Sequence, residues 1–494
     1  MSETNEKKQG FWNSPLTRSR VLSDKVKMPE MLLGYFIGPF GALLSSGIFT
    51  SILQSYFTDV LKLDLAFLTT LQLVSTIFIV ASNLIVGQLI EHTRALAGKA
   101  RPWLLLSALS LSVSCVLMFI VPFEGTARLV WIAIAYNLYY AVAYPIYNTA
   151  NSTMIPVSTR DSKQRGALAS FTNVAGLGVM GCGSMVFPML VSFALKENQN
   201  LWFLTMLAVA VFSALTIYLQ FLFTRERVTE EGFAGKNGAQ GAAHKTAKLS
   251  AQLGAVTGDR MWWIVMAFYM LFQWSGAMKN GSMTYYCKWV LDNTFFGTAD
   301  AWGASQSLLS IMGAIPMAVA AVFVVPLANK FGKRLVCGGF MALGAVGGVI
   351  AGVGSGHIVP VAIGVALKCL GSSPACYLIL AMIADVIDHI EFKTGIRTDG
   401  LTMSIYSSLM VAGTPICNAI FSAMLAGCGY DQAASVALGT AAQTAAAQSS
   451  ITISYIWVET ACYLLGAALL IGFWTVEKNL PAEQAAILER QNKK

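Results

Sequence analysis

The chain has 494 residues, of which 55% are hydrophobic and only 12% are charged. That composition excludes an ordinary soluble domain, in which about a quarter of the residues are charged. The formal net charge of +8 does not indicate a nucleic-acid partner, because the basic residues lie in short segments between apolar runs.

Apolar runs long enough to cross a bilayer recur along nearly the whole chain. A spanning helix needs about 20 predominantly apolar residues, and we predict an all-α membrane protein with twelve such helices. A soluble helical protein would need a polar face on most of its helices, and these runs lack one. The predicted spans cover about residues 31–57, 65–90, 103–123, 128–156, 167–194, 201–223, 261–290, 301–328, 335–355, 358–384, 400–428 and 450–475.

The basic residues predict the orientation of these spans. Most of the 33 Lys and Arg fall in the two tails, in the longest interior polar segment and in every second short loop. Cytoplasmic segments carry such an excess, so we expect both termini inside and a location in a bacterial-type plasma membrane. Residues 1–30 are polar and lack a short apolar core, so no cleavable signal peptide is expected.

The longest interior polar stretch divides the predicted spans into two sets of six. Its Gly-, Ala- and Lys-rich centre cannot bury enough apolar surface to form a domain. The nine cysteines show no spacing typical of metal ligands and are interpreted as core residues. The predicted organisation is a tail at 1–30, a six-helix bundle at 31–223, a cytoplasmic linker at 224–260, a second bundle at 261–475 and a tail at 476–494.

A densely charged run between the tenth and eleventh spans is the most informative segment. Residues 384–400 read ADVIDHIEFKTGIRTDG and contain three Asp, one Glu, one His, one Lys and one Arg. Such a density of charge cannot lie in hydrocarbon, so we predict a loop in water.

Three segments give the chain a family resemblance. They are HTRALAGKARPW at 92–103, RER at 225–227 and the charged run at 384–400, of which RER alone is a weak signal. With their order and spacing, the chain resembles the glycoside–pentoside–hexuronide cation symporters, including the melibiose permease. The resemblance implies the major facilitator fold, in which two six-helix repeats surround the transport path. It also implies a sugar or glycoside substrate and coupling to Na⁺ or H⁺.

The charged residues of these segments are predicted to lie at the cytoplasmic surface. We interpret them as an inter-helix charge network that closes this face during transport. The alternative is solvated charge that only sets the topology. The set comprises Glu91, Arg94, Lys99, Arg101, Asp385, Asp388, Glu391 and Arg397.

The predicted span interiors depart from the family pattern. In the sodium-coupled members, acids in spans 2 and 4 bind the cation, whereas the matching positions here include Ile79, Asn83 and Asn148. Asparagines offer neutral oxygens but neither neutralise Na⁺ nor accept a proton. The inherited Na⁺ site is therefore doubtful, and proton coupling through these positions is excluded. The sequence predicts no metal site and no cofactor, with Na⁺ or H⁺ left as coupling ions.

A polar stripe in span 4 is the predicted sugar-binding surface. At 100° per residue its side chains fall on one helix face, and phenols and amides suit the hydroxyl groups and apolar faces of a pyranose. Hydrogen bonding between helices is the alternative. The stripe comprises Asn137, Tyr140, Tyr144, Tyr147, Asn148 and Asn151; weaker candidates are Asn173, Ser404, Ser407 and Ser408.

Three ionisable residues lie inside predicted spans: Lys279, Lys368 and Glu459. Each is costly in hydrocarbon unless paired or hydrated, which makes each a candidate functional residue. One interpretation is that Lys279 or Lys368 binds the carboxylate of a uronide-type substrate. The alternatives are a structural Lys–Glu pair, snorkelling towards the outer surface, or a proton site at Glu459.

The sequence therefore predicts a transporter and no enzyme, because it contains no catalytic constellation. The expected partners are a small-molecule sugar or glycoside and membrane lipid, with no nucleic acid and with protein partners undetermined. Alternatives are an uncoupled facilitator, a carrier of another anionic or amphiphilic solute, and a membrane sensor that does not transport.

Overall fold

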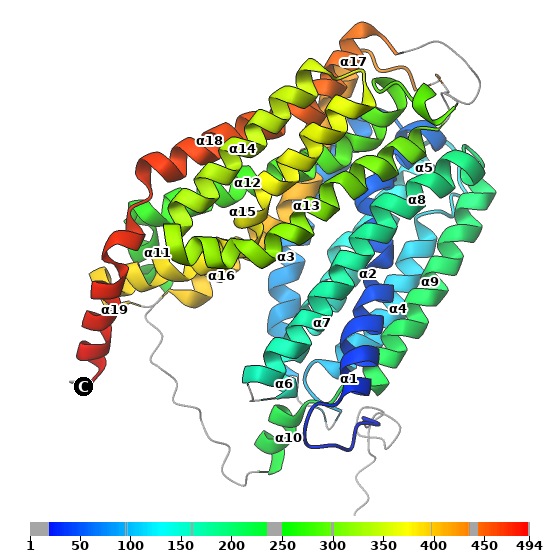
Figure 1. Ribbon diagram of the computed structural model, residues 1–494. Coiled ribbons are helices and arrows are strands. Elements are labelled where there is room, and N and C mark those ends of the chain that lie inside the picture. Colours follow the sequence, from blue (N-terminus) through cyan, green and yellow to red (C-terminus); the bar gives the residue numbers. More distant parts are fainter. Residues whose placement is uncertain are drawn as a thin grey trace, which may run out of the picture. The chain divides into compact units, whose positions relative to one another are not determined.

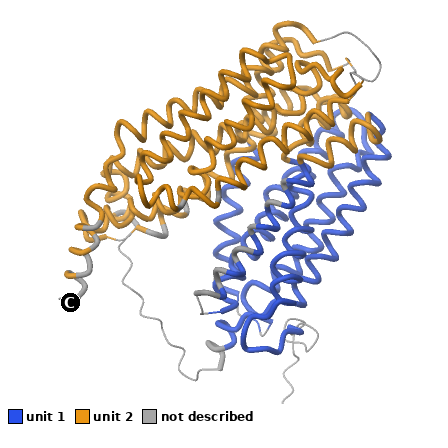
Figure 2. The backbone as a smooth tube through the Cα atoms, viewed as in Figure 1, with its two compact units in different colours: residues 1–49, 74–183, 197–243 blue, residues 50–73, 184–196, 244–494 orange. Residues whose placement is uncertain are grey.

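The computed structural model describes residues 19–492 except 94, 96, 160–161, 235–248, 298–300, 397, 433 and 435–442. Throughout this part of the chain the regular structure is helical, which confirms the all-α prediction (Figure 1). The chain forms two compact units, which Figure 2 distinguishes by colour.

Nine of the described helical segments are long and apolar enough to cross a membrane. Arg101–Leu117 and Cys182–Leu195 are shorter apolar segments. The structure thus confirms a membrane protein with many spans, while the count of twelve stays a prediction. The nine segments are Met28–Leu53, Leu65–Ile90, Gly125–Ser158, Gln199–Leu222, Trp302–Val324, Lys333–Val353, Ile358–Thr394, Leu401–Gly427 and Ala445–Leu480.

Unit 1 contains residues 1–49, 74–183 and 197–243. Several of its helices are interrupted by short π-helical turns, as at Leu33–Ile37 and Leu138–Ala143. Its helices are α1 (Met28–Leu32), α2 (Gly38–Ile48), the part of α3 (Leu65–His92) from residue 74, α4 (Arg101–Leu117), α5 (Gly125–Asn137), α6 (Tyr144–Ser158), α7 (Ser162–Gly181), α9 (Gln199–Leu222) and α10 (Arg227–Ala234).

Glycines allow α2 and α9 to approach closely in unit 1. A Cβ added to Gly38 would lie 2.5 Å from Gln220 Cβ, and one added to Gly41 would lie 2.2 Å from Thr216 Oγ1. Lipid tails are as apolar as the side chains, so membrane helices associate through close packing and hydrogen bonds. Ser213 accordingly donates a hydrogen bond across this interface to Gly41 O at 2.6 Å.

Unit 2 contains residues 50–73, 184–196 and 244–494. It too includes π-helical turns, at Tyr56–Val60, Val191–Leu195 and Ile453–Trp457. Its helices are α8 (Phe187–Leu190), α11 (Leu249–Thr257), α12 (Arg260–Trp289), α13 (Trp302–Phe331), α14 (Lys333–Val353), α15 (Ile358–Thr394), α16 (Asp399–Gly427), α17 (Ala445–Thr452), α18 (Val458–Phe473) and α19 (Val476–Asn492), together with the first residues of α3.

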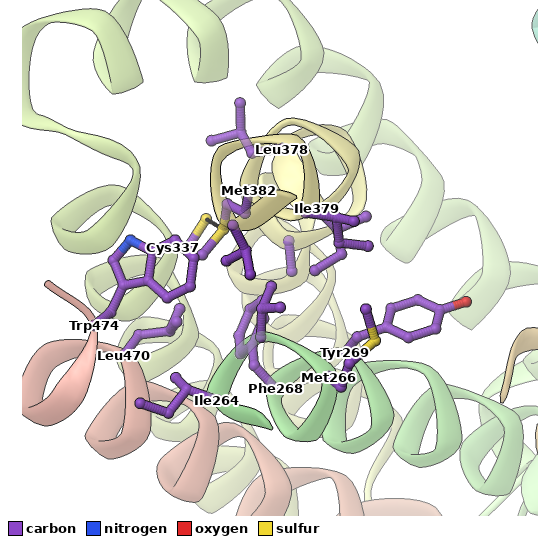
Figure 3. Close-up of a cluster of buried hydrophobic side chains, with 14 of the residues drawn as sticks. Ile264, Met266, Phe268, Tyr269, Cys337, Leu378, Ile379, Met382, Leu470 and Trp474 are labelled. Carbon is purple, nitrogen blue, oxygen red and sulfur yellow. Dashed lines mark hydrogen bonds between the residues drawn. The ribbon is translucent and has the colours of Figure 1, made fainter. Parts of the chain in front are cut away.

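The core of unit 2 is a cluster of buried apolar side chains from α11 to α15 and α18, together with Trp474 and Val476 after α18; Figure 3 shows part of it. Phe268, Met382 and Trp474 are completely buried in it. Cys337 contacts Met382 with 4.0 Å between the sulfur atoms. Flexible thioethers and aromatic rings fill the irregular space between crossing helices.

Glycines allow α14 and α15 to approach closely in unit 2. A Cβ added to Gly371 of α15 would lie 2.6 Å from Gly344 Cα and 2.6 Å from Phe340 O. Both atoms belong to the backbone, so neither can rotate away. Glycine at this crossing is therefore a requirement of packing.

The charged run at 384–400 is mostly helical, and the prediction of a loop over this run is wrong for most of its length. α15 continues without a break to Thr394, and Gly395 then ends it with φ of +70°. A left-handed glycine at this position is a common helix C-terminus. α16 begins at Asp399, so the connection is only a few residues long.

The predicted domain boundaries stay predictions. Residues 235–248, the centre of the predicted linker, lie outside the described part of the chain. Segments 50–73 and 184–196, which belong to the first half of the sequence, group with unit 2.

Substituting Gly371 tests the packing of α14 on α15. We expect Gly371→Ala to lower the melting temperature of the detergent-purified protein, because overpacking costs about 1–3 kcal/mol. The matched control is Gly339→Ala in α14, where an added Cβ meets no atom within 4 Å and alanine favours the helix. Equal melting temperatures of the two variants would contradict the close approach.

Candidate functional site

The fourth predicted span consists of α5, the π-helical turn Leu138–Ala143 and α6. A π-helical turn holds more residues than an α-helical turn, so it rotates the faces on its two sides relative to each other. The prediction of one continuous stripe at 100° per residue is therefore wrong across this turn. Asn137 precedes the turn, and its amide donates to Ala133 O of the same helix at 2.9 Å.

Aromatic rings cluster at this π-helical turn. The ring of Tyr139 lies 4.7 Å from Phe49 and 5.0 Å from Tyr140, centroid to centroid. Tyr139 is completely buried and forms a 2.8 Å hydrogen bond with Ser45. Tyr139 was absent from the predicted stripe because the uniform helical period places it on another face.

Two residues of the predicted stripe, Tyr147 and Asn151, bind Gln220 of α9. Tyr147 donates to Gln220 Oε1 at 3.0 Å, and Gln220 Nε2 donates to Asn151 Oδ1 at 2.7 Å. All three side chains are buried. This is the interhelical hydrogen bonding that the sequence left as the alternative. A glutamine within the apolar sixth span was the available signal for it.

The other three stripe residues, Tyr140, Tyr144 and Asn148, keep accessible surface. Each is half-buried in unit 1, at or just after the π-helical turn. Their phenol and amide groups combine aromatic faces with hydrogen-bond donors and acceptors and carry no charge. Asn173 lies in α7, but its side chain is outside the described part of the structure.

The two predicted cation positions present neutral amides. Asn83 is half-buried in α3 and donates to Ile79 O of the same helix at 2.8 Å. Within the described residues, no group of three or more His, Cys, Asp or Glu could hold a metal ion. A cation at Asn83 or Asn148 would therefore meet neutral oxygen ligands from these side chains.

Glu226 organises the charged end of unit 1. Its carboxylate accepts hydrogen bonds from the backbone N–H groups of Lys99, Ala100 and Arg101 at 2.7–2.8 Å, and from Thr229 Oγ1 at 2.9 Å. These N–H groups lie at the start of α4, where the helix leaves its donors unpaired. A carboxylate is also favoured there by the helix dipole.

Arg101, predicted to belong to the gate, is anchored within unit 1. Its guanidinium donates to Phe221 O at 2.8 Å and to Ala97 O at 3.0 Å, and it lies 4.6 Å from the centre of the Phe221 ring. Only 3% of Arg101 is exposed. Its contacts join the 92–103 segment to the end of α9.

The RER motif is more important than its weak sequence signal suggested. Arg227 forms a buried ion pair with Glu30 at 2.7 Å. Arg225 binds Glu230 at 2.9 Å, and this hydrogen bond raises the pKa of Arg225. With Glu226 between them, three consecutive residues connect α1, α4 and α10.

The predicted gate residues of unit 2 lie along the last turns of α15. Asp385 pairs with Lys333 at 2.5 Å, while Asp388 and Glu391 are half-buried. Arg94 and Arg397, and the side chain of Glu91, lie outside the described part of the structure. The structure therefore places Asp385 in a defined ion pair within unit 2.

A second charged cluster at this end of unit 2 was not predicted. His389 binds Glu483 of α19 at 2.8 Å through Nδ1, and Lys393 binds Asp259 at 2.9 Å. Glu483 is nearly buried, although it lies in the tail after the last predicted span. The sequence of this tail gives no sign that Glu483 contacts His389, which lies 94 residues earlier in the chain.

The three ionisable residues predicted inside the spans come together in unit 2. Glu459 of α18 lies between Lys368 of α15, at 2.5 Å, and Lys279 of α12, at 3.3 Å. Tyr463 donates to Glu459 Oε1 at 2.8 Å. The arrangement contains the structural Lys–Glu pair that the sequence offered as an alternative, and it adds a second lysine.

Another ion pair in unit 2 was not predicted, because its acid, Asp59, lies in the short segment between the first two predicted spans. Asp59 binds Lys288 at 2.5 Å and also accepts from Thr58 at 2.7 Å and from Tyr430 at 3.1 Å. Lys288 also lies 4.8 Å from the centre of the Trp302 ring. Asp59 thereby joins residues 50–73 to Lys288 of α12 and to Tyr430, which follows α16.

Comparison with known proteins is consistent with this geometry. A family model described as MFS/sugar transport protein matches residues 34–475. The isoprimeverose transporter of Lactiplantibacillus pentosus is 28% identical, covering 97% of this chain and 95% of that protein. A putative glycoside/cation symporter of Escherichia coli (strain K12) is 26% identical, covering 78% and 80% respectively.

Solved structures share the fold at low sequence identity. The crystal structure of the nucleoside transporter NupG matches with a TM-score of 0.61 and 14% identity, covering 90% of this chain and 99% of that one. At this identity the likeness concerns the fold alone.

Glu226→Gln tests the capping of α4. We expect a loss of about 1–3 kcal/mol and a lower melting temperature, because an amide N–H₂ would face backbone donors. The control is Glu230→Gln, which removes the same charge from an exposed ion pair whose contribution to stability is small. A melting temperature for Glu226→Gln equal to that of the control would refute the capping role.

Proposed function

Because the chain belongs to the MFS/sugar transport protein family, we propose that it carries a sugar or glycoside across the plasma membrane by alternating access. Its relatives and structural neighbours are transporters and not enzymes. The observation that supports the sugar assignment is the uncharged polar surface of Tyr140, Tyr144 and Asn148. In a membrane helix, such side chains are retained facing polar partners or a substrate, and not lipid.

The chemistry of these three residues matches a glycoside. The amide of Asn148 supplies a donor and an acceptor for adjacent hydroxyl groups of a sugar ring. The rings of Tyr140 and Tyr144 can lie against the apolar face of a pyranose. Tyr147 and Asn151 fix α6 against α9 through Gln220 and so hold Asn148 in place.

The charged helix ends form the proposed gate, facing the cytoplasm with both termini inside. Within it, Arg101 acts as an anchor because its donors bind carbonyl groups of its own unit. The Lys333–Asp385 pair is the one that exchanges partners during transport, since both side chains are charged and Lys333 retains exposed surface. Lys99, Asp388 and Glu391 belong to the same gate.

Cation coupling follows from the resemblance to a glycoside/cation symporter. The acids of the sodium-coupled pattern are replaced by Asn83 and Asn148, so the coupling cation binds elsewhere or through neutral oxygens. Two carboxylates of unit 2, Asp59 and Glu459, are already paired with lysines. Because these carboxylates are paired with lysines and the acids of the sodium-coupled pattern are replaced, the competing function is that of an uncoupled facilitator.

Substitution of Asn148 tests the sugar-binding surface. We expect Asn148→Ala to weaken binding of the transported glycoside about tenfold, because a good hydrogen bond contributes about 1.4 kcal/mol. Binding is measured by calorimetry and transport by counterflow in proteoliposomes. Tyr218→Phe is the control, since Tyr218 is exposed on α9. Equal affinity of Asn148→Ala and the wild type would remove Asn148 from the site, and absence of counterflow in the wild type would indicate a sensor.

Uptake under imposed gradients tests coupling. We expect an inward gradient of Na⁺ or of protons to drive glycoside accumulation above equilibrium in proteoliposomes. Asn83→Ala should retain this accumulation, because its amide already binds its own helix. Equilibration that no gradient alters would establish a facilitator.

A further inference from the structure

The cluster of Lys279, Lys368 and Glu459 carries two positive charges and one negative charge. Lys368 and Glu459 are each 1% exposed, whereas 17% of the Lys279 side chain is accessible. A net charge in a membrane span is costly unless it is paired or hydrated. One more anion would neutralise this cluster.

Lys368 is surrounded by oxygen atoms of its own unit. Its ammonium lies 2.5 Å from Glu459 Oε2 and donates to Tyr455 O at 3.3 Å and Ile456 O at 3.4 Å. Those carbonyls belong to the π-helical turn Ile453–Trp457. An ammonium has three N–H donors, and the ammonium of Lys368 has three oxygen neighbours within its own unit, two carbonyl oxygens and the paired carboxylate.

Lys279 is the member with spare capacity. Its ammonium has one carboxylate neighbour, Glu459 Oε1 at 3.3 Å, and a weak contact of 3.9 Å with Cys369 Sγ. Glu459 Oε1 also accepts from Tyr463, and its other oxygen faces Lys368. The surplus positive charge of the cluster is thus localised at Lys279.

Charged groups on the neighbouring elements do not neutralise Lys279. The described residues of α12, α13 and α14 include no carboxylate, and Asp399, at the first residue of α16, has a side chain outside the described part of the structure. The acids of α15 lie in its last turns, where Asp385 pairs with Lys333. Asp59 pairs with Lys288. Space exists beside Lys279, because a Cβ added to Gly276, three residues earlier on the same helix face, meets no atom within 4 Å.

We infer that Lys279 is the binding site for the carboxylate of an acidic sugar, such as a uronide. This inference rests on the proposed function and names its substrate class. A carboxylate brings one negative charge, which neutralises the cluster, and oxygens that accept from the unused donors of Lys279. A neutral glycoside could accept hydrogen bonds from Lys279 but would leave the net positive charge of the cluster without a counterion. The Lys368–Glu459 pair positions Lys279 and does not contact the substrate.

Matched pairs of sugars test the inference. The probes are methyl β-D-glucuronide with methyl β-D-glucoside, and methyl α-D-galacturonide with methyl α-D-galactoside. Within a pair the ring is the same and only the carboxylate differs. For at least one pair, we expect the full-length wild-type protein to bind the acid at least tenfold more tightly than the neutral sugar in calorimetry, and to exchange it in counterflow.

Variants of Lys279 locate the effect. Lys279→Gln should abolish the preference for the acid while retaining the affinity for the neutral sugar, which also shows that the variant is folded. Lys279→Arg should keep a preference, because it keeps the charge. Lys330→Gln is the control: it removes a lysine from the end of α13, where Lys330 is exposed and lies over the Phe331 ring.

The possible outcomes separate the two proposals. Equal binding of acid and neutral sugar in every pair, or a preference that survives in Lys279→Gln, overturns the inference and leaves sugar transport standing. If no probe binds or exchanges, the sugar assignment fails and the inference fails with it.

Discussion

A charge at membrane depth must find its partner within the protein, because hydrocarbon supplies neither water nor counterions. In unit 2 this constraint is met at Glu459, and at the charged helix end of unit 1 a second buried glutamate, Glu226, collects donors in a similar way. Glu226 gathers three backbone donors at the start of α4 in unit 1, and Glu459 gathers two lysines and a tyrosine in unit 2. Helices distant in sequence are joined at each of these residues.

Glycines and π-helical turns make such contacts possible. Gly371 and Gly344 bring α15 against α14, the helix that also packs on α18, which carries Glu459. The π-helical turn Ile453–Trp457, directly before Glu459, directs two carbonyl groups at Lys368. A regular α-helix keeps its carbonyl groups for its own ladder, so the irregular turn and the buried lysine depend on each other.

The fold class was predictable because long apolar runs are a strong local signal. The family was predictable because charged segments such as 384–400 combine several residue types in a fixed order. The mostly helical conformation of residues 384–400 was not predictable, because a high density of charge indicates contact with water but does not indicate the backbone conformation. α15 continues past the apolar segment because its charged side chains find partners on neighbouring elements, as in Lys333–Asp385 and Lys393–Asp259.

The polar residues of span 4 also show that local sequence predicts a helix but does not predict contacts with helices distant in the sequence. These residues were correctly placed on a helix, but the period failed at Leu138–Ala143 because nothing in a Tyr-rich apolar run marks a π-helical turn. Whether an amide is free for a ligand also depends on other helices. Asn148 and Asn151 look alike in the sequence, yet Gln220, about 70 residues away, binds only Asn151 of the two.

For Lys279 and Lys368 too, the role of the side chain depends on contacts with other helices. Both are single lysines in apolar spans, and the sequence assigned them the same alternatives. In the structure, one carboxylate is shared between them, but carbonyl groups of a π-helical turn complete the coordination of Lys368 alone. The residue with fewer partners and more accessible surface is the one that can accept a ligand, because binding there replaces no protein contact. The number of partners that each ammonium has in the structure therefore distinguishes a structural lysine from a lysine that can bind a ligand. Residue type and position within the span do not distinguish them.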